Sequence, residues 1–421
     1  MLALSLAACT SGSSATTPDV VTSDPQTSST STISSTSTTS PPQEAEDLLA
    51  FARGVLLVSA EGLEENEGVL YQLIDGNPEP ITLTTASGGA VSMVFKLPVN
   101  TEFDWLGVAP VIDARSGAAF EGSVLVEGSI DGPGSGFVEL VEVEVGSAAD
   151  GSGAEPAGGV PVKWLRVTLT PEGSSDQGRG RIVFAELIGF GVEERGVETS
   201  TAFNGIWDLR LLGRPESAGE RLELIQDGTL VTGCLDTLEI RATVNGAVAL
   251  GIGREESSGR EAAVVLVADE EGTISATVAF DNGRFETRLA HAPARETDRQ
   301  CSLPESESAV CDTPLYVNFA YDSAEIRSES EAVLDDIYRI LVQVGVESVT
   351  VRGHTSTEGT DEHNLVLSEE RAQAVVSELI ERGFPAEGIS AVGLGESEPI
   401  VFPDDDEASR SINRRVELEC G

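Results

Sequence analysis

The chain has 421 residues and is strongly acidic, with 71 Asp and Glu against 26 Lys and Arg and a formal net charge of −45. This balance excludes nucleic acid as a partner, because binding it requires a basic face. The length predicts two or three domains with connecting segments. No run of about 18 apolar residues occurs, so the sequence predicts no transmembrane helix.

The first nine residues, MLALSLAAC, form a short apolar segment that ends in small residues and Cys9. The box Leu6-Ala7-Ala8-Cys9 resembles a lipoprotein signal, although a chance Ala-Ala-Cys is the alternative. We expect residues 1–8 to be part of a signal peptide and Cys9 to carry a lipid anchor. Residues 9–47 are rich in Ser and Thr and contain no basic residue, so we expect a disordered tether.

Four cysteines remain after Cys9, and an even number in an exported chain predicts two disulfides with three possible pairings. A Cys311–Cys420 bond would join the two ends of the last domain. Cys234 and Cys301 would then pair in the domain before it. The chain has no Cys-x-x-Cys spacing and its three His residues are scattered, so we expect neither a metal site nor a cofactor.

Residues 48–198 consist of short strand-forming runs that Gly and Pro separate, which predicts a β-sandwich. Five motifs in this segment resemble a discoidin-like (coagulation-factor type C) module in their order and spacing. The resemblance implies either sugar or lipid binding through loops or packing against neighbouring proteins, and both interpretations stay open. The motifs are Leu73-Ile74-Asp75-Gly76-Asn77, Val94-Phe95-Lys96-Leu97, Val124-Leu125-Val126-Glu127-Gly128-Ser129, Val162-Lys163-Trp164-Leu165-Arg166-Val167 and Ala185-Glu186-Leu187-Ile188-Gly189-Phe190-Gly191.

Residues 199–300 form a second β-rich segment. Asn245-Gly246 and Asp281-Asn282-Gly283 are strong hairpin signals between apolar runs. The opening Gly205-x-Trp207 followed by hairpins resembles a lipocalin-like barrel, which implies a small closed sheet. We expect Trp207 to be a core residue of that barrel.

Residues 301–421 alternate strand and helix patterns, which predicts an α/β sandwich with the order βαβαβ-β. The first strand is expected at residues 315–319 and the second at 349–353. A polar loop should follow at residues 354–366. A helical pattern of apolar residues then opens at Leu367.

A motif in this last segment carries a specific resemblance. Its elements are Gly353-His354-Thr355-Ser356, Gly359 and Asn364-x-x-Leu367-Ser368-x-x-Arg371-Ala372. In order and spacing they resemble the core motif of OmpA-like peptidoglycan-binding domains. Phe319-Ala320-Tyr321-Asp322-Ser323 and Asn413-Arg414-Arg415-Val416-Glu417 resemble two further family motifs. One position departs, because the family's Asp is Ser356 here.

The resemblance implies a site for the peptide stem of peptidoglycan, held at diaminopimelate. That residue's side chain ends in an ammonium and a carboxylate. The resemblance assigns the cation of the site to Arg371, whose planar fork can hold a carboxylate through two parallel hydrogen bonds. Placement of Arg371 in the first turn of a helix would add backbone N–H groups that favour an anion. A surface salt bridge from Arg371 to Glu369 or Asp361 is the alternative.

The anion of the site is the open question. Ser356 is a neutral acceptor and binds an ammonium more weakly than a carboxylate does. Glu358 and Asp361 follow in the same expected loop and are candidates to replace it. Asn364 is expected either to contact the ligand or to support the loop and cap the helix. Thr355 is a further candidate for ligand contact.

These features predict a cell-envelope lipoprotein that binds peptidoglycan non-covalently and tethers a membrane to the cell wall. Its location would be the outer membrane, or the outer face of the cytoplasmic membrane in an organism with a single membrane. Glycans or other envelope proteins are further expected partners. No nucleophile elbow or phosphate loop occurs, so we expect no enzyme. The alternative is a carbohydrate-binding or carbohydrate-active surface protein that uses residues 48–198.

Overall fold

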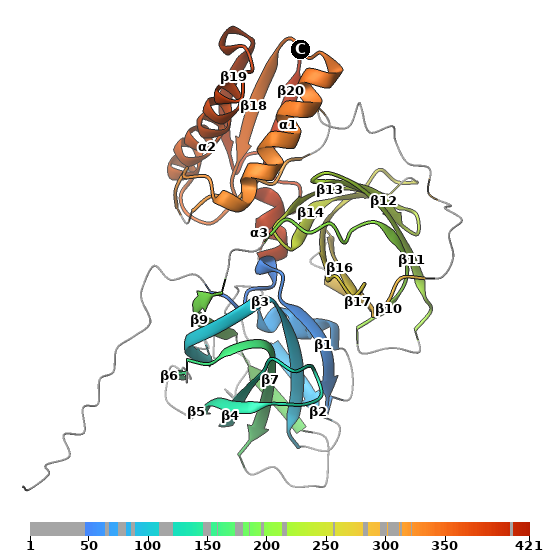
Figure 1. Ribbon diagram of the computed structural model, residues 1–421, viewed down its shortest axis with the longest axis vertical. Helices are drawn as coiled ribbons and strands as arrows, with labels where there is room; N and C mark the ends of the chain where they lie inside the picture. Colours follow the sequence, from blue (N-terminus) through green and yellow to red (C-terminus); the bar gives the residue numbers. More distant parts are fainter. Residues whose placement is uncertain are drawn as a thin grey trace, which may run out of the picture. The chain divides into compact units, whose positions relative to one another are not determined.

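The computed structural model describes most of the chain from residue 47 onward (Figure 1). Cys9, the expected signal peptide and residues 9–46 of the expected tether lie outside the described residues, as does the Asp75-Gly76-Asn77 part of the first motif. The described residues are 47–421 apart from 64–66, 75–80, 86–88, 109–120, 146–152, 158, 173–179, 185, 195–197, 213–216, 256, 281–284, 295–300, 302–310, 312–313, 321 and 405–406.

The first β-rich segment forms a seven-stranded sheet and a two-stranded sheet, which confirms its expected β-rich class. The larger sheet has the order β1-β3-β7-β4-β5, with β6 and β9 also paired to β3, while β2 and β8 form the smaller sheet. The elements are η1 (Phe51–Arg53), β1 (Leu56–Glu61), η2 (Glu67–Leu73), β2 (Ile81–Thr85), β3 (Val91–Val108), β4 (Gly122–Ser129), β5 (Val138–Val145), β6 (Gly153–Pro156), β7 (Pro161–Pro171), β8 (Gly180–Phe184) and β9 (Leu187–Glu193).

The alternating sequence of these strands explains how the larger sheet buries one face. In β5, Val143 and Val145 are buried while Glu142 and Glu144 are exposed. Successive side chains of a strand point to opposite faces, so this alternation places the valines in the core and the glutamates in water. Much of the acidic charge in this segment is therefore compatible with the fold.

The second β-rich segment closes into an eight-stranded barrel, as the hairpin signals predicted. Each strand pairs with the next, and β17 returns to β10 through Arg210↔Leu289 and Leu211↔Arg288. Closure removes the open sheet edges at which other chains could pair. The strands are β10 (Gly205–Leu211), β11 (Glu220–Asp227), β12 (Leu230–Leu235), β13 (Leu238–Asn245), β14 (Val248–Glu255), β15 (Glu261–Ala268), β16 (Ile274–Phe280) and β17 (Phe285–Ala290).

The barrel interior is filled by side chains. Trp207 is fully buried in this cluster and donates its indole N–H to the carbonyl oxygen of Gly272 at 3.0 Å. The expected Asn245-Gly246 hairpin joins β13 to β14, with Gly246 in the left-handed region at φ 56°. Trp207 thus has the expected core role.

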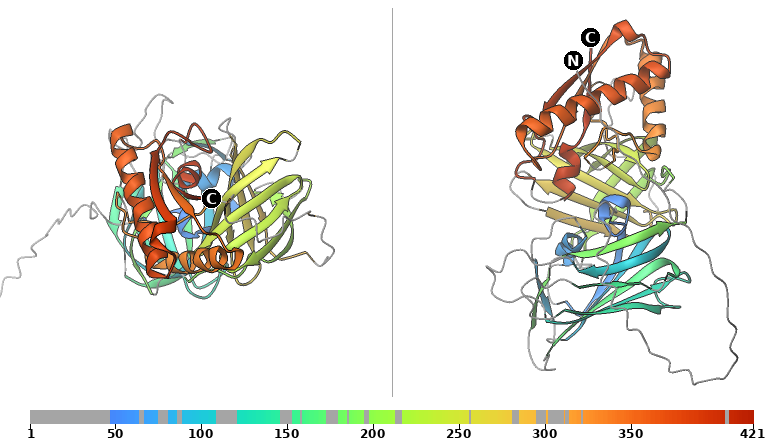
Figure 2. Two further views of the ribbon diagram at one scale, coloured as in Figure 1. Left: turned by 90° about the horizontal axis from the view of Figure 1, so that it is seen from above. Right: turned by 90° about the vertical axis from the view of Figure 1, so that its left-hand side faces the viewer.

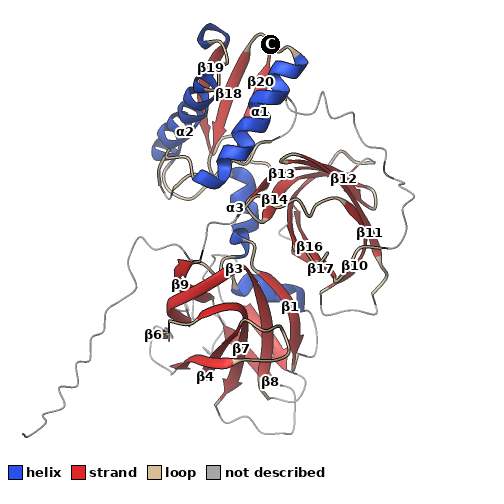
Figure 3. Cartoon of the chain, in the orientation of Figure 1, coloured by secondary structure: helices blue, strands red, loops and turns tan. Residues whose placement is uncertain are grey.

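The C-terminal segment is an α/β unit built on a three-stranded sheet with the order β19-β18-β20 (Figure 3). The central strand β18 runs parallel to β19 and antiparallel to β20. Two helices, α1 and α2, share one hydrophobic core with this sheet. The elements are η5 (Ser328–Ser330), α1 (Glu331–Val344), β18 (Val349–His354), α2 (Asp361–Glu381), η6 (Ala386–Gly388), β19 (Ile389–Gly395), α3 (Glu407–Asn413) and β20 (Val416–Cys420).

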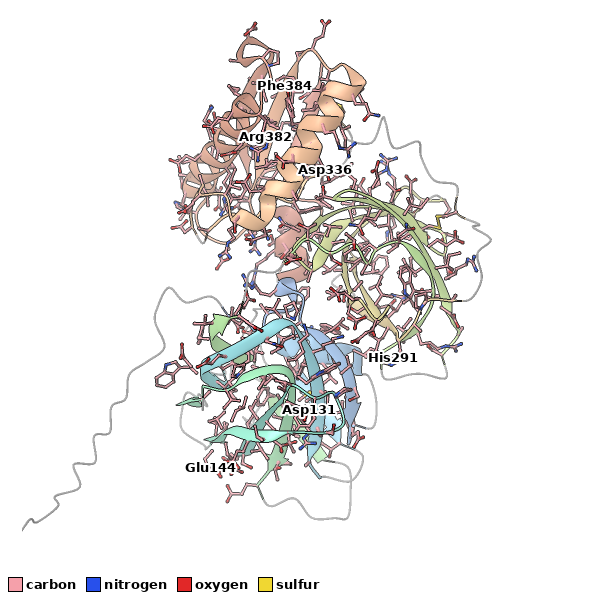
Figure 4. All side chains as sticks on the ribbon, in the orientation of Figure 1. Asp131, Glu144, His291, Asp336, Arg382 and Phe384 are labelled. Atoms are coloured by element: carbon pink, nitrogen blue, oxygen red, sulfur yellow. A yellow bond between two sulfur atoms is a disulfide. The ribbon has the colours of Figure 1, made fainter. Side chains whose placement is uncertain are left out.

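Figure 2 shows the two long helices of the C-terminal segment, and charged side chains join them at one end, where Arg382 lies (Figure 4). Arg382 follows α2 and donates from Nε to Asp335 of α1 at 2.8 Å. The same guanidinium also pairs with Glu331 of α1 and Glu378 of α2. One Arg fork thus connects the end of α2 to the start of α1.

Two expected boundaries in this segment are wrong. Residues 315–319 form only isolated bridges, Leu315↔Val416 and Phe319↔Ile326, instead of a full strand. The helix expected to open at Leu367 begins six residues earlier, at Asp361. The side chain of Thr360 accepts the backbone N–H of His363, and this N-cap starts the helix before the apolar pattern does.

Disulfides join Cys234 to Cys301 and Cys311 to Cys420. Cys420 lies at the end of β20, so the second bond ties the two ends of the C-terminal segment together.

Within the part of the chain that the structure describes, no helix has the length and apolar character needed to cross a membrane.

Removing the second disulfide should destabilise the C-terminal segment. The bond closes a separation of 109 residues. The double variant Cys311→Ser and Cys420→Ser should lower its free energy of unfolding by about 2–4 kcal/mol, because the unfolded chain gains conformational freedom. Calorimetry of the whole chain measures the change. The matched variant Cys234→Ser and Cys301→Ser should leave the C-terminal transition in place, and an unchanged transition without Cys311–Cys420 would contradict this account.

Candidate functional site

Helix α2 lies close to strands β18 and β19 because glycines on the strands leave room for it. A Cβ on Gly353 would come within 2.2 Å of the carbonyl oxygen of Ser368. A Cβ on Gly393 would come within 2.5 Å of the backbone nitrogen of Glu369. This close approach buries the helix face with i, i+3, i+4, i+7 spacing. The residues on that face are Asn364, Leu367, Ser368 and Arg371.

Arg371 is a buried cation, with 9% of the residue exposed. Its Nε donates to the carbonyl oxygen of Ser323 at 3.0 Å, and its guanidinium carbon lies 5.0 Å from the ring centroid of Phe319. Burial and, to a smaller extent, Arg414 lower the pKa of Arg371 while Asp322 raises it, and the net pKa is about 10. The group therefore stays charged at neutral pH.

No described carboxylate forms an ion pair with Arg371. The expected alternative, a surface salt bridge to Glu369 or Asp361, is therefore wrong. Glu369 instead hydrogen-bonds the backbone N–H of Gly393. A buried charge without an ion-pair partner is costly, so an anion that paired with this guanidinium would stabilise it.

The expected placement of Arg371 in the first turn of a helix is also wrong. It comes ten residues after Asp361, at which α2 begins. Ten residues correspond to about 15 Å along the helix axis. The unpaired backbone N–H groups of the helix start are therefore too far away to help Arg371 hold an anion.

Thr355 and Ser356 lie at the start of the loop between β18 and α2, Asn364 lies in the first turn of α2, and all three are buried. Asn364 donates from Nδ2 to the carbonyl oxygen of Ser356 at 3.2 Å and to Oε2 of Glu396 at 2.6 Å. The backbone N–H of Thr355 donates to the carbonyl oxygen of Gly395 at 3.0 Å. Asn364 thus supports the loop from inside the helix and is not its cap.

Residues 318–414 match the family model described as OmpA family. This stretch is an OmpA family domain. Outer membrane protein A of Shigella flexneri is 34% identical over 160 residues, which cover 36% of this chain and 44% of that protein. The chain spans less than half the length of the first curated relatives it matches, at 44%, 40% and 46%.

Solved structures that are similar to parts of the chain include the following two. The peptidoglycan-associated lipoprotein from Burkholderia pseudomallei is 32% identical, with a TM-score of 0.23, covering 25% of this chain and 88% of that one. The module CBM32-3 of a family 31 glycoside hydrolase from Clostridium perfringens is 15% identical, with a TM-score of 0.28, covering 35% of this chain and 96% of that one.

Two buried polar residues hold the site loop of the OmpA family domain: Asp404, which the sequence did not point to, and Asn413, the first residue of the closing motif. Asp404 accepts the backbone N–H of Thr357 at 3.0 Å and also hydrogen-bonds the Thr357 hydroxyl. Asn413 donates to the same carboxylate at 2.9 Å. Its amide also accepts the backbone N–H groups of Ile400 and Val401. Asn413 is therefore part of the loop's support.

Glu358 and Asp361, the two acidic candidates of the expected loop, are both exposed. Asp361 lies in the first turn of α2, where a negative charge is favourable to the helix dipole. Within the described part of the chain, neither side chain forms a hydrogen bond or ion pair. The structure does not bring either one to Arg371.

A third carboxylate, Glu417 on β20, is already occupied. It accepts from Arg415 at 2.7 Å and from Arg352 at 3.3 Å. Burial raises its pKa, but His354 and Arg415 outweigh burial and hold the pKa at about 2. Burial lowers the pKa of His354, and Glu417 opposes that shift. Glu417 therefore stabilises the sheet and is not a free anion for a ligand.

Truncating Asp404 should loosen the site. Asp404→Ala leaves the backbone N–H of Thr357 and the amide of Asn413 without their acceptor. The loss should be about 1–3 kcal/mol for each buried donor. Denaturant unfolding of the full chain measures it. Asp361→Ala is the matched control and should change stability by less than about 0.5 kcal/mol. An Asp404→Ala chain as stable as its parent would refute this support.

Proposed function

We propose that the OmpA family domain binds peptidoglycan non-covalently through its stem peptides. The observation that carries this proposal is the buried, charged guanidinium of Arg371, which has no carboxylate partner among the described residues. A buried cation of this kind favours a ligand that brings an anion. One relative by structure is named a peptidoglycan-associated lipoprotein, which supports the same class of ligand.

The chemistry of the ligand fits Arg371. A diaminopimelate side chain in a stem peptide ends in a carboxylate. The Nε of Arg371 already donates to the carbonyl oxygen of Ser323, so the two terminal nitrogens can both face the ligand carboxylate. Parallel N–H···O bonds from one guanidinium are charge-assisted and fix the orientation of the carboxylate. The Phe319 ring beneath the guanidinium limits its movement, which reduces the entropy lost on binding.

The wider role follows from joining this site to the N-terminal segment. A lipid on Cys9 would hold one end of the chain to a membrane, and the OmpA family domain would hold the other end to the wall. The two β-rich segments would act as spacers or contact modules. The chain would then lie in the cell envelope, at the outer membrane or at the outer face of the cytoplasmic membrane where only one membrane exists. Outer membrane relatives support an envelope location.

Replacing Arg371 tests the site. Arg371→Ala should weaken binding to purified sacculi and to a soluble diaminopimelate stem peptide by about ten- to a hundred-fold, because a charge-assisted pair is lost. Arg371→Lys keeps the positive charge but loses the planar fork of the guanidinium. Its affinity should lie between those of the parent chain and of Arg371→Ala. Calorimetric titration measures the affinity, and circular dichroism checks that each variant is folded.

The matched control is Arg254→Ala, which removes the same charge from an exposed position of the barrel strand β14. It should bind like the parent chain. If folded Arg371→Ala binds as tightly as the parent, the proposed function is wrong.

The anchor is tested separately. In cells that export the chain, Cys9→Ala should move the protein from the membrane fraction to the soluble fraction, because no thiol remains to be lipidated. Fractionation followed by immunodetection measures the distribution. The variant should still bind purified sacculi. A Cys9→Ala chain that sediments with membranes freed of peptidoglycan would show that Cys9 is not the anchor.

A further inference from the structure

The site as described lacks an anion for the ammonium of a zwitterionic ligand. Ser356 is neutral and buried, and its carbonyl oxygen already accepts from Asn364. Glu396 is also committed, since it accepts from the same amide at 2.6 Å. Asp361 lies about 15 Å along the helix axis from Arg371. An acidic group from a different part of the domain is required.

A tight turn before α1 presents such a group. The turn is closed by the bridge Phe319↔Ile326 and by the backbone bond from Ala320 to Glu325 at 2.9 Å. Asp322 lies in this turn with φ 47°, a left-handed conformation that Asp and Asn tolerate better than most residues. Its side chain is 54% exposed, so the carboxylate is accessible to a ligand.

This turn meets helix α2 at two points. The carbonyl oxygen of Ser323 accepts from Nε of Arg371 at 3.0 Å. The neighbouring Asp322 places Oδ1 2.6 Å from Nε2 of His363. His363 and Arg371 are eight residues apart, which places them about 80° apart around α2 and about 12 Å apart along its axis, so the turn reaches both residues. Asp322 is therefore held against α2 and is the chain neighbour of the residue that binds Arg371.

Asp322 and Arg371 interact without touching. Asp322 adjoins Ser323, whose carbonyl oxygen accepts from Arg371, and the Asp322 carboxylate raises the pKa of the guanidinium. They form no ion pair, and the only described partner of the Asp322 side chain is His363. Because Arg371 and Asp322 do not pair with each other, both charges are available to a zwitterionic ligand, whose carboxylate can meet the cation and whose ammonium can meet the anion.

We propose that Asp322 supplies the anion that receives the ligand's ammonium, so that Asp322 and Arg371 together select a zwitterionic side chain. This assignment rests on the proposed function. It makes Asp322 a specificity-determining residue in place of Ser356, Glu358 and Asp361. The ligand's carboxylate lies against Arg371, and its ammonium meets the exposed side of the Asp322 carboxylate.

The test compares two soluble stem peptides on the full chain by calorimetric titration. One carries diaminopimelate, and in the other the side-chain amino group is replaced by hydrogen. The parent chain should prefer the first peptide by about ten- to a hundred-fold. Asp322→Asn should lose most of that preference while keeping the positive φ. The preference of the parent should also fall with added salt, because Asp322 is half exposed.

Asp361→Asn is the matched control, since it removes the same charge from an exposed site on α2, and it should keep the full preference. If Asp322→Asn retains the preference of the parent, another group holds the ammonium and this assignment fails while peptide binding stands. If the parent chain binds neither peptide, the proposed function itself fails, and the assignment fails with it.

Discussion

The C-terminal domain depends on how closely α2 packs against its sheet. Gly353 and Gly393 remove the side chains that would hold the helix away, and the close approach buries Arg371. A buried guanidinium loses hydration that a single backbone carbonyl and an aromatic ring replace only in part. The fold nevertheless holds the charged guanidinium in a fixed orientation. A ligand carboxylate would complete the interactions that the protein leaves unmet.

Groups far apart in the sequence hold the site in place. Asp404 and Asn413 fix Thr357 from the segment between β19 and β20, and Glu396 fixes Asn364 from the end of β19. These bonds are buried or half-buried, so each of them resists exchange with water. A loop held in this way loses little freedom when a ligand binds, and more of the interaction energy then appears as affinity.

Much of the fold could be predicted from the sequence, because its signals are local. Alternating valines predicted strands, Asn245-Gly246 predicted a hairpin, and the apolar pattern from Leu367 predicted the body of α2. The start of α2 could not be found from apolar periodicity, since a hydroxyl of Thr360 sets it. The roles of Asp322 and Asp404 could not be found either. Each depends on a partner 41 or 47 residues away, and no local pattern encodes such a pairing.

The net charge of −45 bears on how such a site can work. Peptidoglycan stems carry carboxylates of their own, so the protein as a whole repels its proposed ligand and gains nothing from long-range attraction. Affinity must then come from a local arrangement of charge. A buried cation suits this demand, because low exposure reduces screening by salt and strengthens each contact that it makes. An acidic surface would meanwhile oppose non-specific adhesion to the anionic wall, leaving Arg371 and its surroundings to decide what is bound.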